Sequence, residues 1–465
     1  MYPQQQQAQM QASTPLRLAL VARTLETSAT LAMNEAVAKR RAAGLETIHL
    51  GFGEAAFPLH PLLRAALAEA APHTSYAPVL GIPALRQAIA EYLNRTRGLA
   101  TAPECIAVAP GSKPLLYALL QVLTGDVLLP VPSWVSYAPQ ARLAGKRVIA
   151  IETDASDHHR LAPDILSETL AHARREGANP GILLVNTPSN PTGSMFDAVD
   201  AEAIALWARA EGITLISDEI YAELAHGWRE HVSPARFYPE GCIVTGGLSK
   251  AFSAGGWRLG YAMLPTGSEG SALMATMRAL ASEIWSSTAT PVMEAAVSAY
   301  LPNAEIERYV QRSARLHGYT ALRLYETLTA LGIPCPRPAG GFYLYPDFAP
   351  LRIALGERGI TTSEELARYL LDEWGIATLP GSVFGEQPEA LRLRLATSLL
   401  YEPGGKPTTE EREAWLWHLL EQADQLSPTG QDSDAQLSLP ALARAQAQLT
   451  DFVQATLFHT GKDTQ

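Results

Sequence analysis

Residues 246–262 read GGLSKAFSAGGWRLGYA, and one lysine, Lys250, lies there among glycine, serine and alanine. A lysine in a glycine-rich stretch is most often a solvated group on a flexible loop. The flanking residues favour another interpretation. Residues 242–245 form an apolar, β-branched run typical of a buried parallel strand, and residues 257–263 again alternate like a strand. Lys250 is therefore expected just after a buried strand, where loss of solvent lowers the pKa of an amine and lets it condense with an aldehyde.

Short apolar runs alternate with segments of helical periodicity from about residue 105 onward. The predicted strands are CIAVA (105–109), DVLLP (126–130), RVIAI (147–151), GILLVN (181–186), ITLIS (213–217) and CIVTG (242–246). The predicted helices lie near 113–123, 134–144, 163–176 and 198–210. This alternation predicts an α/β fold with a mostly parallel sheet that helices cover on both faces. Ligands bind beyond the carboxyl ends of such strands, so the residues after each strand are the candidate site.

The composition is that of a large soluble enzyme. The 465 residues suffice for one large or two moderate domains, and 47% of them are hydrophobic and 18% charged. A formal net charge of -11 argues against a nucleic-acid partner, because phosphate binding requires an excess of Lys and Arg. Three scattered cysteines predict neither a disulfide framework nor a metal site. With no membrane-spanning run and no signal peptide, a cytoplasmic protein is expected.

The sequence predicts two domains, a disordered lead and a C-terminal extension. The Gln-rich residues 1–14 are predicted to be a disordered lead, and residues 52–300 a large cofactor-binding domain. Residues 15–51 and 301–425 are predicted to form a smaller domain. Residues 426–465 are predicted to be a polar linker and a helical extension, with the helix over 439–458. The apolar stripe of that helix is interpreted as a packing surface in preference to a functional one.

Distinctive side chains follow the predicted strands. Gly111, Ser112 and Lys113 open a helix whose exposed N–H groups suit a phosphate, although an ordinary helix cap has the same pattern. Trp134 offers a flat face for a planar ring, or fills the core. Asn190 lies in NTPSNPTG, which is either a simple turn or a rigid loop that holds its amide inward.

Two further positions complete this set. Asp218 ends an apolar strand, where a carboxylate is costly unless it meets a positive partner, and Tyr221 follows it. Arg258 comes eight residues after Lys250. Pyridoxal 5′-phosphate (PLP) fits the whole constellation, because its aldehyde needs a lysine, its pyridine nitrogen an acid partner and its phosphate an anion site.

These motifs resemble those of the class I and II aminotransferases of PLP fold type I. GLSKAFSAGGWRLG (247–260) is similar to that family's lysine-site signature. Five other stretches resemble the bacterial aspartate aminotransferase branch: TSATLAMNEAVAKRRAAG (27–44), SYAPVLGIPALRQAI (75–89), PSWVSY (132–137), NTPSNPTG (186–193) and SDEIY (217–221). The resemblance covers residues 24–425 and implies a seven-stranded sheet in the large domain, with an α+β small domain.

The resemblance also implies a reaction. An amino group would pass between an aspartate-like or aromatic L-amino acid and a 2-oxo acid such as 2-oxoglutarate, by a ping-pong mechanism. Lys250 would form the internal aldimine and shuttle a proton, while Asp218 keeps the pyridine nitrogen protonated. Tyr221 and Asn190 would hydrogen-bond the ring oxygen O3′, and Trp134 would stack on the ring.

The phosphate site implied by the resemblance includes Arg258, Ser112 and the backbone of residues 111–113. Ser249 is also a cofactor-binding candidate, although it would alternate away from the phosphate, and Gly247 replaces a hydroxyl that the family often has. Tyr76 matches a tyrosine that reaches the phosphate across a dimer interface. A homodimer with shared sites is therefore expected.

Substrate contacts are assigned in the same way. Arg392 matches the arginine that binds the substrate α-carboxylate, and Arg394 is expected on the other strand face, without a role in the site. Gly53 and Asn190 are further substrate-binding candidates. Lys113 either meets a side-chain carboxylate of the substrate or is a surface lysine at a helix start.

Two other functions remain open from the residues. One fold hosts several PLP reactions, so a β-lyase or an amino-acid oxidase is possible, particularly because the family's Gly-Glu-Pro-Asp reads Gly-Glu-Ala-Ala at residues 53–56. A PLP-binding regulator is the second alternative. It is disfavoured because the acidic chain shows no basic DNA-binding domain ahead of the resembling part.

Overall fold

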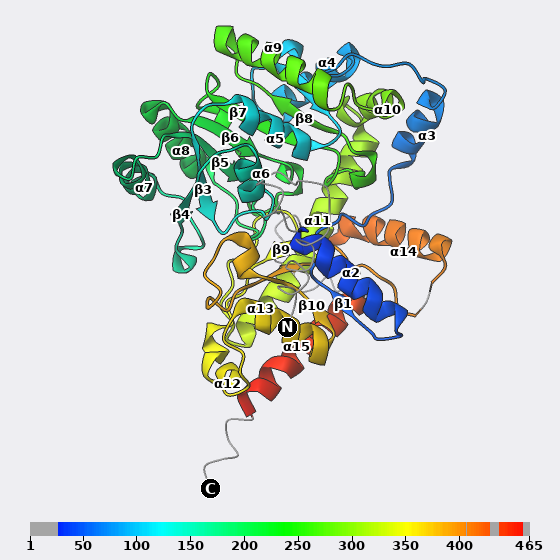
Figure 1. Ribbon diagram of the computed structural model, residues 1–465. Coiled ribbons are helices and arrows are strands. Elements are labelled where there is room, and N and C mark those ends of the chain that lie inside the picture. Colours follow the sequence, from blue (N-terminus) through cyan, green and yellow to red (C-terminus); the bar gives the residue numbers. More distant parts are fainter. Residues whose placement is uncertain (1–26, 406, 428–436, 459–465) are drawn as a thin grey trace, which may run out of the picture.

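The computed structural model describes residues 27–405, 407–427 and 437–458 (Figure 1). The predicted disordered lead and most of the predicted linker lie outside these ranges. At the centre of the larger part is a seven-stranded sheet in the order β2-β8-β7-β6-β5-β3-β4. Its strands are β2 (Ile106–Ala109), β3 (Asp126–Val131), β4 (Val148–Glu152), β5 (Pro180–Asn186), β6 (Thr214–Asp218), β7 (Cys242–Gly247) and β8 (Gly260–Met263). Neighbouring strands are parallel except at β8, which is antiparallel to β2 and β7, so the predicted mostly parallel sheet is confirmed.

Helices cover both faces of this sheet because successive strand residues are apolar on both sides. In β7, Cys242 and Val244 belong to one hydrophobic cluster, while Ile243 belongs to another. The first cluster is closed by α4 (Pro83–Arg97), α7 (Pro163–Arg175), α8 (Ala198–Glu211) and α10 (Thr290–Tyr300), with α3 (Pro61–Ala70) packed on α10. The second is closed by α5 (Ser112–Val122), α6 (Tyr137–Leu143) and α9 (Gly267–Ile284).

A separate hydrophobic cluster lies below the sheet in Figure 1 and joins residues 50–57 to residues 309–453. Two small sheets belong to this part: β1 (Ile48–His49) with β10 (Ile376–Ala377), and β11 (Leu379–Pro380), β12 (Leu393–Ala396) and β9 (Tyr343–Leu344). Its helices are α2 (Ala29–Ala42), α12 (Arg352–Gly356), α13 (Ser363–Trp374) and α14 (Thr409–Gln422). The long α11 (Ala304–Ala330) contributes buried residues to this cluster and to the first sheet cluster. The division into domains at residues 52 and 300 stays a prediction.

The C-terminal helix, α15 (Pro440–Phe458), packs onto this lower part. Its Leu449 and Phe452 are fully buried, and the Phe452 ring contacts the rings of Phe348 and Trp374. The apolar stripe read from the sequence is thus a packing surface. Among the residues described, no helix is both long and apolar enough to cross a membrane.

Candidate active site

Lys250 lies three residues beyond the end of β7, as expected for a residue at the carboxyl edge of the sheet. Its partly buried amine donates a hydrogen bond to the carbonyl oxygen of Gly53 (2.7 Å), which brings the predicted substrate-site glycine next to the lysine. Burial, and then the positive charge of Arg394, lower the pKa of Lys250 to about 8. The amine therefore becomes a nucleophile closer to neutral pH than an exposed lysine would.

Asp218 ends β6 and is only 3% exposed. One carboxylate oxygen accepts a hydrogen bond from the Tyr137 hydroxyl (2.8 Å) and the other from the Thr245 hydroxyl (2.9 Å). Burial raises the pKa of this carboxyl to about 6, against the opposing effect of these two donors. A buried carboxylate held in one orientation is suited to a protonated ring nitrogen.

A cradle for an anion lies at the start of α5. Gly111 precedes this helix with φ +99°, and Ser112 is its first residue. A Cβ atom on Gly111 would lie 2.4 Å from a guanidinium nitrogen of Arg258, so glycine allows this arginine to approach the helix N-terminus. The Arg258 guanidinium donates to the carbonyl oxygen of Gly255 (2.9 Å), and Ser249 lies against Gly255. Exposed helix N–H groups beside an arginine form a phosphate site.

Lys113 and Trp134 lie side by side at the edge of this cradle. The Lys113 amine is 4.9 Å from the centre of a Trp134 ring, and Trp134 contacts the Tyr137 ring edge-on (5.1 Å). Burial, and then Arg258, lower the pKa of Lys113. The Trp134 side chain therefore lies between the cradle and the hydroxyl that orients Asp218.

Tyr343, which the sequence reasoning missed, contacts several predicted site residues. Its hydroxyl is 2.8 Å from the Tyr221 hydroxyl, and its ring lies 4.9 Å from the guanidinium carbon of Arg394. A Cβ on Gly53 would meet the Tyr343 hydroxyl at 2.1 Å, so residue 53 must be glycine for this packing. Tyr343 lies in GGFYLYPDF (340–348), and no local pattern identifies it as a site residue, because its contacts come from segments distant in the sequence.

The assignment of the two arginines near β12 must be corrected. The guanidinium of Arg394 is buried and donates to Asn190 Oδ1 (3.3 Å) and the Gly51 carbonyl oxygen (2.6 Å). Arg392 instead donates to the carboxylates of Asp347 (3.0 Å) and Glu386 (2.6 Å), which neutralise it. The expected alternation was wrong, because residues two apart on one strand share a face and alternation cannot separate these arginines. Arg392 precedes the first residue of β12 and pairs outside the site.

Tyr76 is 93% exposed. This chain's own cradle does not enclose it, and its predicted role across a dimer interface stays a prediction. A cavity of about 450 Å³ adjoins the site and has Tyr137 and Asn190 among its lining residues. Within the described ranges, no group of His, Cys, Asp and Glu side chains is arranged to hold a metal ion.

Comparison with known proteins identifies the family. The model of the aminotransferase class I and II family matches residues 46–399, well over half of the chain. The chain belongs to the class I and II aminotransferases. Enzymes of this family use PLP, and PLP is the cofactor of this aminotransferase. The residues present fit it, since a lysine amine, a buried carboxylate and an anion cradle surround one edge of the sheet.

The relatives agree with this placement. The aminotransferase is 36% identical over 395 residues to the aspartate aminotransferase of Geobacillus stearothermophilus, covering 83% of this chain and 95% of that protein. It is 35% identical to the aspartate/prephenate aminotransferase of Thermus thermophilus, covering 80% and 93%. The solved structure of Thermus thermophilus aspartate aminotransferase with maleate matches with a TM-score of 0.74 at 32% identity, covering 87% and 98%. The predicted family, PLP fold type I and enzyme class are confirmed, and neither a lyase, an oxidase nor a regulator is favoured.

Proposed function

We propose that this aminotransferase moves the amino group of an acidic L-amino acid, aspartate in the first place, to a 2-oxo acid such as 2-oxoglutarate. The observation that carries the proposal is the pair of cations at the site, Arg394 beside Asn190 and Lys113 beside Trp134. Two cations suit a substrate with two carboxylates. The names of the relatives, aspartate and aspartate/prephenate aminotransferases, support the same class and keep an aromatic partner as the second candidate.

Four residues would hold the cofactor's ring and do the proton chemistry. Bound PLP supplies an aldehyde for a lysine and a ring that withdraws electrons from the substrate Cα. The amine of Lys250 would take and return the Cα proton, which its lowered pKa favours. Asp218 would hold the ring nitrogen in its protonated form. Tyr221 and the Asn190 amide would donate to the ring oxygen, since Asn190 Oδ1 already accepts from Arg394.

The phosphate would lie on the N-terminus of α5, held by Ser112 and Arg258, with Gly111 giving access to the backbone N–H groups. Trp134 would cover one face of the ring and exclude water from it. These contacts would hold the cofactor while the side chain of Lys250 moves.

Arg394 is the proposed partner of the substrate α-carboxylate. Its guanidinium has five N–H donors, and its Nε–H has no partner within the described part of the chain. The face of the guanidinium rests on the Tyr343 ring, which fixes its plane for a two-bond contact. Arg392, already paired with two carboxylates, is withdrawn from this role.

Lys113→Ala is expected to raise KM for aspartate and 2-oxoglutarate by about three- to fivefold, because Lys113 is exposed and a solvent-screened charge contact is worth at most about 1 kcal/mol. KM for phenylalanine or alanine should change less than about twofold. Steady-state kinetics on this panel is the measurement, and Lys113→Arg, which keeps the charge, is the matched control. An equal loss for every donor would show that Lys113 serves the cofactor or the fold instead.

We further propose a homodimer in which Tyr76 reaches the neighbouring site. Two observations support it: the Tyr76 side chain is 93% exposed, and the sequence resembles a family in which a tyrosine crosses the dimer interface. Sedimentation should give twice the 50.1 kDa of one chain. Tyr76→Phe should weaken PLP binding several-fold, about the effect of one hydrogen bond to a charged group. Tyr117→Phe should not, because the hydroxyl of this half-buried residue of α5 only accepts a hydrogen bond from Gln121. A monomer that turns over at the full rate would refute this.

We also propose a cytoplasmic location, which the three free cysteines support.

A further inference from the structure

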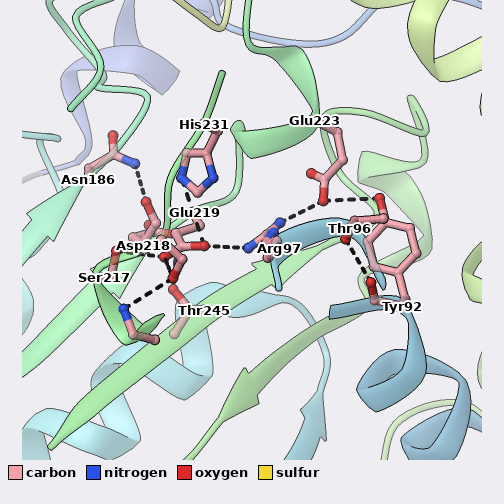
Figure 2. Close-up of polar contacts among 12 residues, drawn as sticks. Tyr92, Thr96, Arg97, Asn186, Ser217, Asp218, Glu219, Glu223, His231 and Thr245 are labelled. Carbon is pink, nitrogen blue, oxygen red and sulfur yellow. Dashed lines mark hydrogen bonds and ion pairs between the residues drawn. The ribbon is translucent and has the colours of Figure 1, made fainter. Parts of the chain in front are cut away.

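A buried ion cluster includes Glu219 and Glu223 of the segment that follows Asp218, and Figure 2 shows Arg97 between these two carboxylates. At its centre is Arg97, the last residue of α4. Its two terminal nitrogens donate to Glu219 Oε2 and Glu223 Oε1, each at 2.6 Å. The side chains of Arg97, Glu219 and Glu223 are 4%, 0% and 13% exposed. One guanidinium thus bridges two carboxylates away from solvent.

Other polar groups complete the cluster. Glu219 Oε1 accepts from the hydroxyls of Ser217 (3.0 Å) and Ser233 (2.6 Å), and Glu223 accepts from the Tyr92 hydroxyl (3.2 Å). His231 Nε2 lies 3.9 Å from Glu219. These directed bonds allow little freedom to either carboxylate. Both oxygens of Glu219 accept buried hydrogen bonds, and such bonds restrict the orientation of the carboxylate.

The two glutamates of the cluster are close in sequence to two proposed cofactor-binding residues. Glu219 follows Asp218 directly, and Glu223 comes two residues after Tyr221. Arg97 therefore holds the chain on both sides of Tyr221, at the residue directly after Asp218 and at Glu223. The backbone N–H of Glu219 also donates to the Thr245 carbonyl oxygen (2.9 Å), and the Thr245 hydroxyl donates to Asp218.

We propose that Arg97 is a positioning residue for the cofactor: its planar fork fixes residues 218–223, and thereby the carboxylate of Asp218 and the hydroxyl of Tyr221. This inference rests on the roles proposed above for those two residues. Stability alone is a weak reason for such a cluster, because well-packed apolar side chains often stabilise a core at least as well as buried ion pairs. A lysine could supply the charge but not two rigid, coplanar hydrogen bonds.

The test compares wild type, Arg97→Lys and Arg209→Lys. Arg209 is the control: its guanidinium also makes two hydrogen bonds, but to the single carboxylate of Glu240 (2.6 and 2.8 Å) on the exposed surface. Three quantities are measured on each protein: the PLP dissociation constant of the apoenzyme, the pH midpoint of the bound cofactor's visible absorbance, and the melting temperature. Steady-state kinetics adds kcat and KM.

For Arg97→Lys we expect a roughly tenfold weaker PLP affinity, the equivalent of one well-placed hydrogen bond. The pH midpoint should move by about half a unit or more, because the Tyr221 hydroxyl and the Asp218 carboxylate no longer keep their positions. The value of kcat should fall more than KM rises. Arg209→Lys should match wild type throughout.

A variant that melts earlier but keeps the wild-type dissociation constant and pH midpoint would overturn the proposal, since Arg97 would then serve the fold alone. If Arg97→Lys fails to fold, Glu223→Gln weakens one arm only and must shift the same two quantities in the same direction. Wild-type values there would also overturn it. Failure of all proteins, wild type included, to bind PLP would instead refute the proposed cofactor roles.

Discussion

Lys250→Ala is expected to lower kcat by about 10⁴-fold or more, because its amine is the proposed covalent partner of PLP and the proposed base for the Cα proton. Its place beyond β7 and its pKa, which burial lowers to about 8, support this proposed role. The measurement is kcat with saturating aspartate and 2-oxoglutarate, together with the visible absorbance of the purified protein. The wild-type absorbance of the lysine-linked cofactor should be lost.

Lys39→Ala is the control, since this exposed lysine lies on α2. It should leave kcat and the absorbance unchanged. The melting temperature of the Lys250 variant should stay near that of wild type, because a substitution that removes one charge from a site adds no strain to the core. A variant with normal absorbance and turnover would show that another amine holds the cofactor.

Arg394→Met is expected to lower kcat/KM by about 10²–10³-fold, the loss of two hydrogen bonds to a charged group. The same loss should occur with aspartate, glutamate and phenylalanine, because every amino acid carries the α-carboxylate. Arg392→Met should change kcat/KM by less than about fivefold, since Asp347 and Glu386 already neutralise Arg392. Kinetics on the two variants, with Arg394→Lys as the charge-retaining control, is the measurement.

The opposite ranking would contradict the structure and restore the assignment made from the sequence motif. A loss confined to dicarboxylic donors would also contradict it, because Arg394 would then read the side chain. Melting temperatures distinguish either outcome from misfolding, which the buried position of Arg394 makes necessary to check.

Much of the fold follows from local patterns. Each apolar run read as a strand between residues 105 and 246 is a strand in the sheet, and the helix expected over 439–458 is α15. The grouping of the candidate residues also follows from the strand order, because parallel strands end at one edge, and Gly111, Trp134, Asn190, Asp218 and Lys250 lie at or after strand ends; their roles toward the cofactor stay a proposal. Their spacing along the chain matters less than their place after a strand.

What could not be predicted depends on side-chain partners that are distant in sequence. The difference between Arg392 and Arg394 is made by Asp347, which is 45 residues away from Arg392, and by the start of β12. The hydrogen bond from Arg97 to Glu219 joins residues that are 122 positions apart, and no local sequence motif predicts it. Such pairings arise only when helices and strands are packed.

In the proposed ping-pong reaction, the enzyme-bound cofactor keeps the amino group after the first product leaves and before the second substrate binds. A single-turnover experiment tests this most directly. PLP-loaded enzyme is mixed with aspartate or glutamate without any 2-oxo acid, while its visible absorbance is followed. We expect that the initial absorbance is lost, that one equivalent of 2-oxo acid forms per site, and that 2-oxoglutarate or oxaloacetate then restores the absorbance. Continued product formation without an acceptor, with release of ammonia or consumption of oxygen, would contradict it.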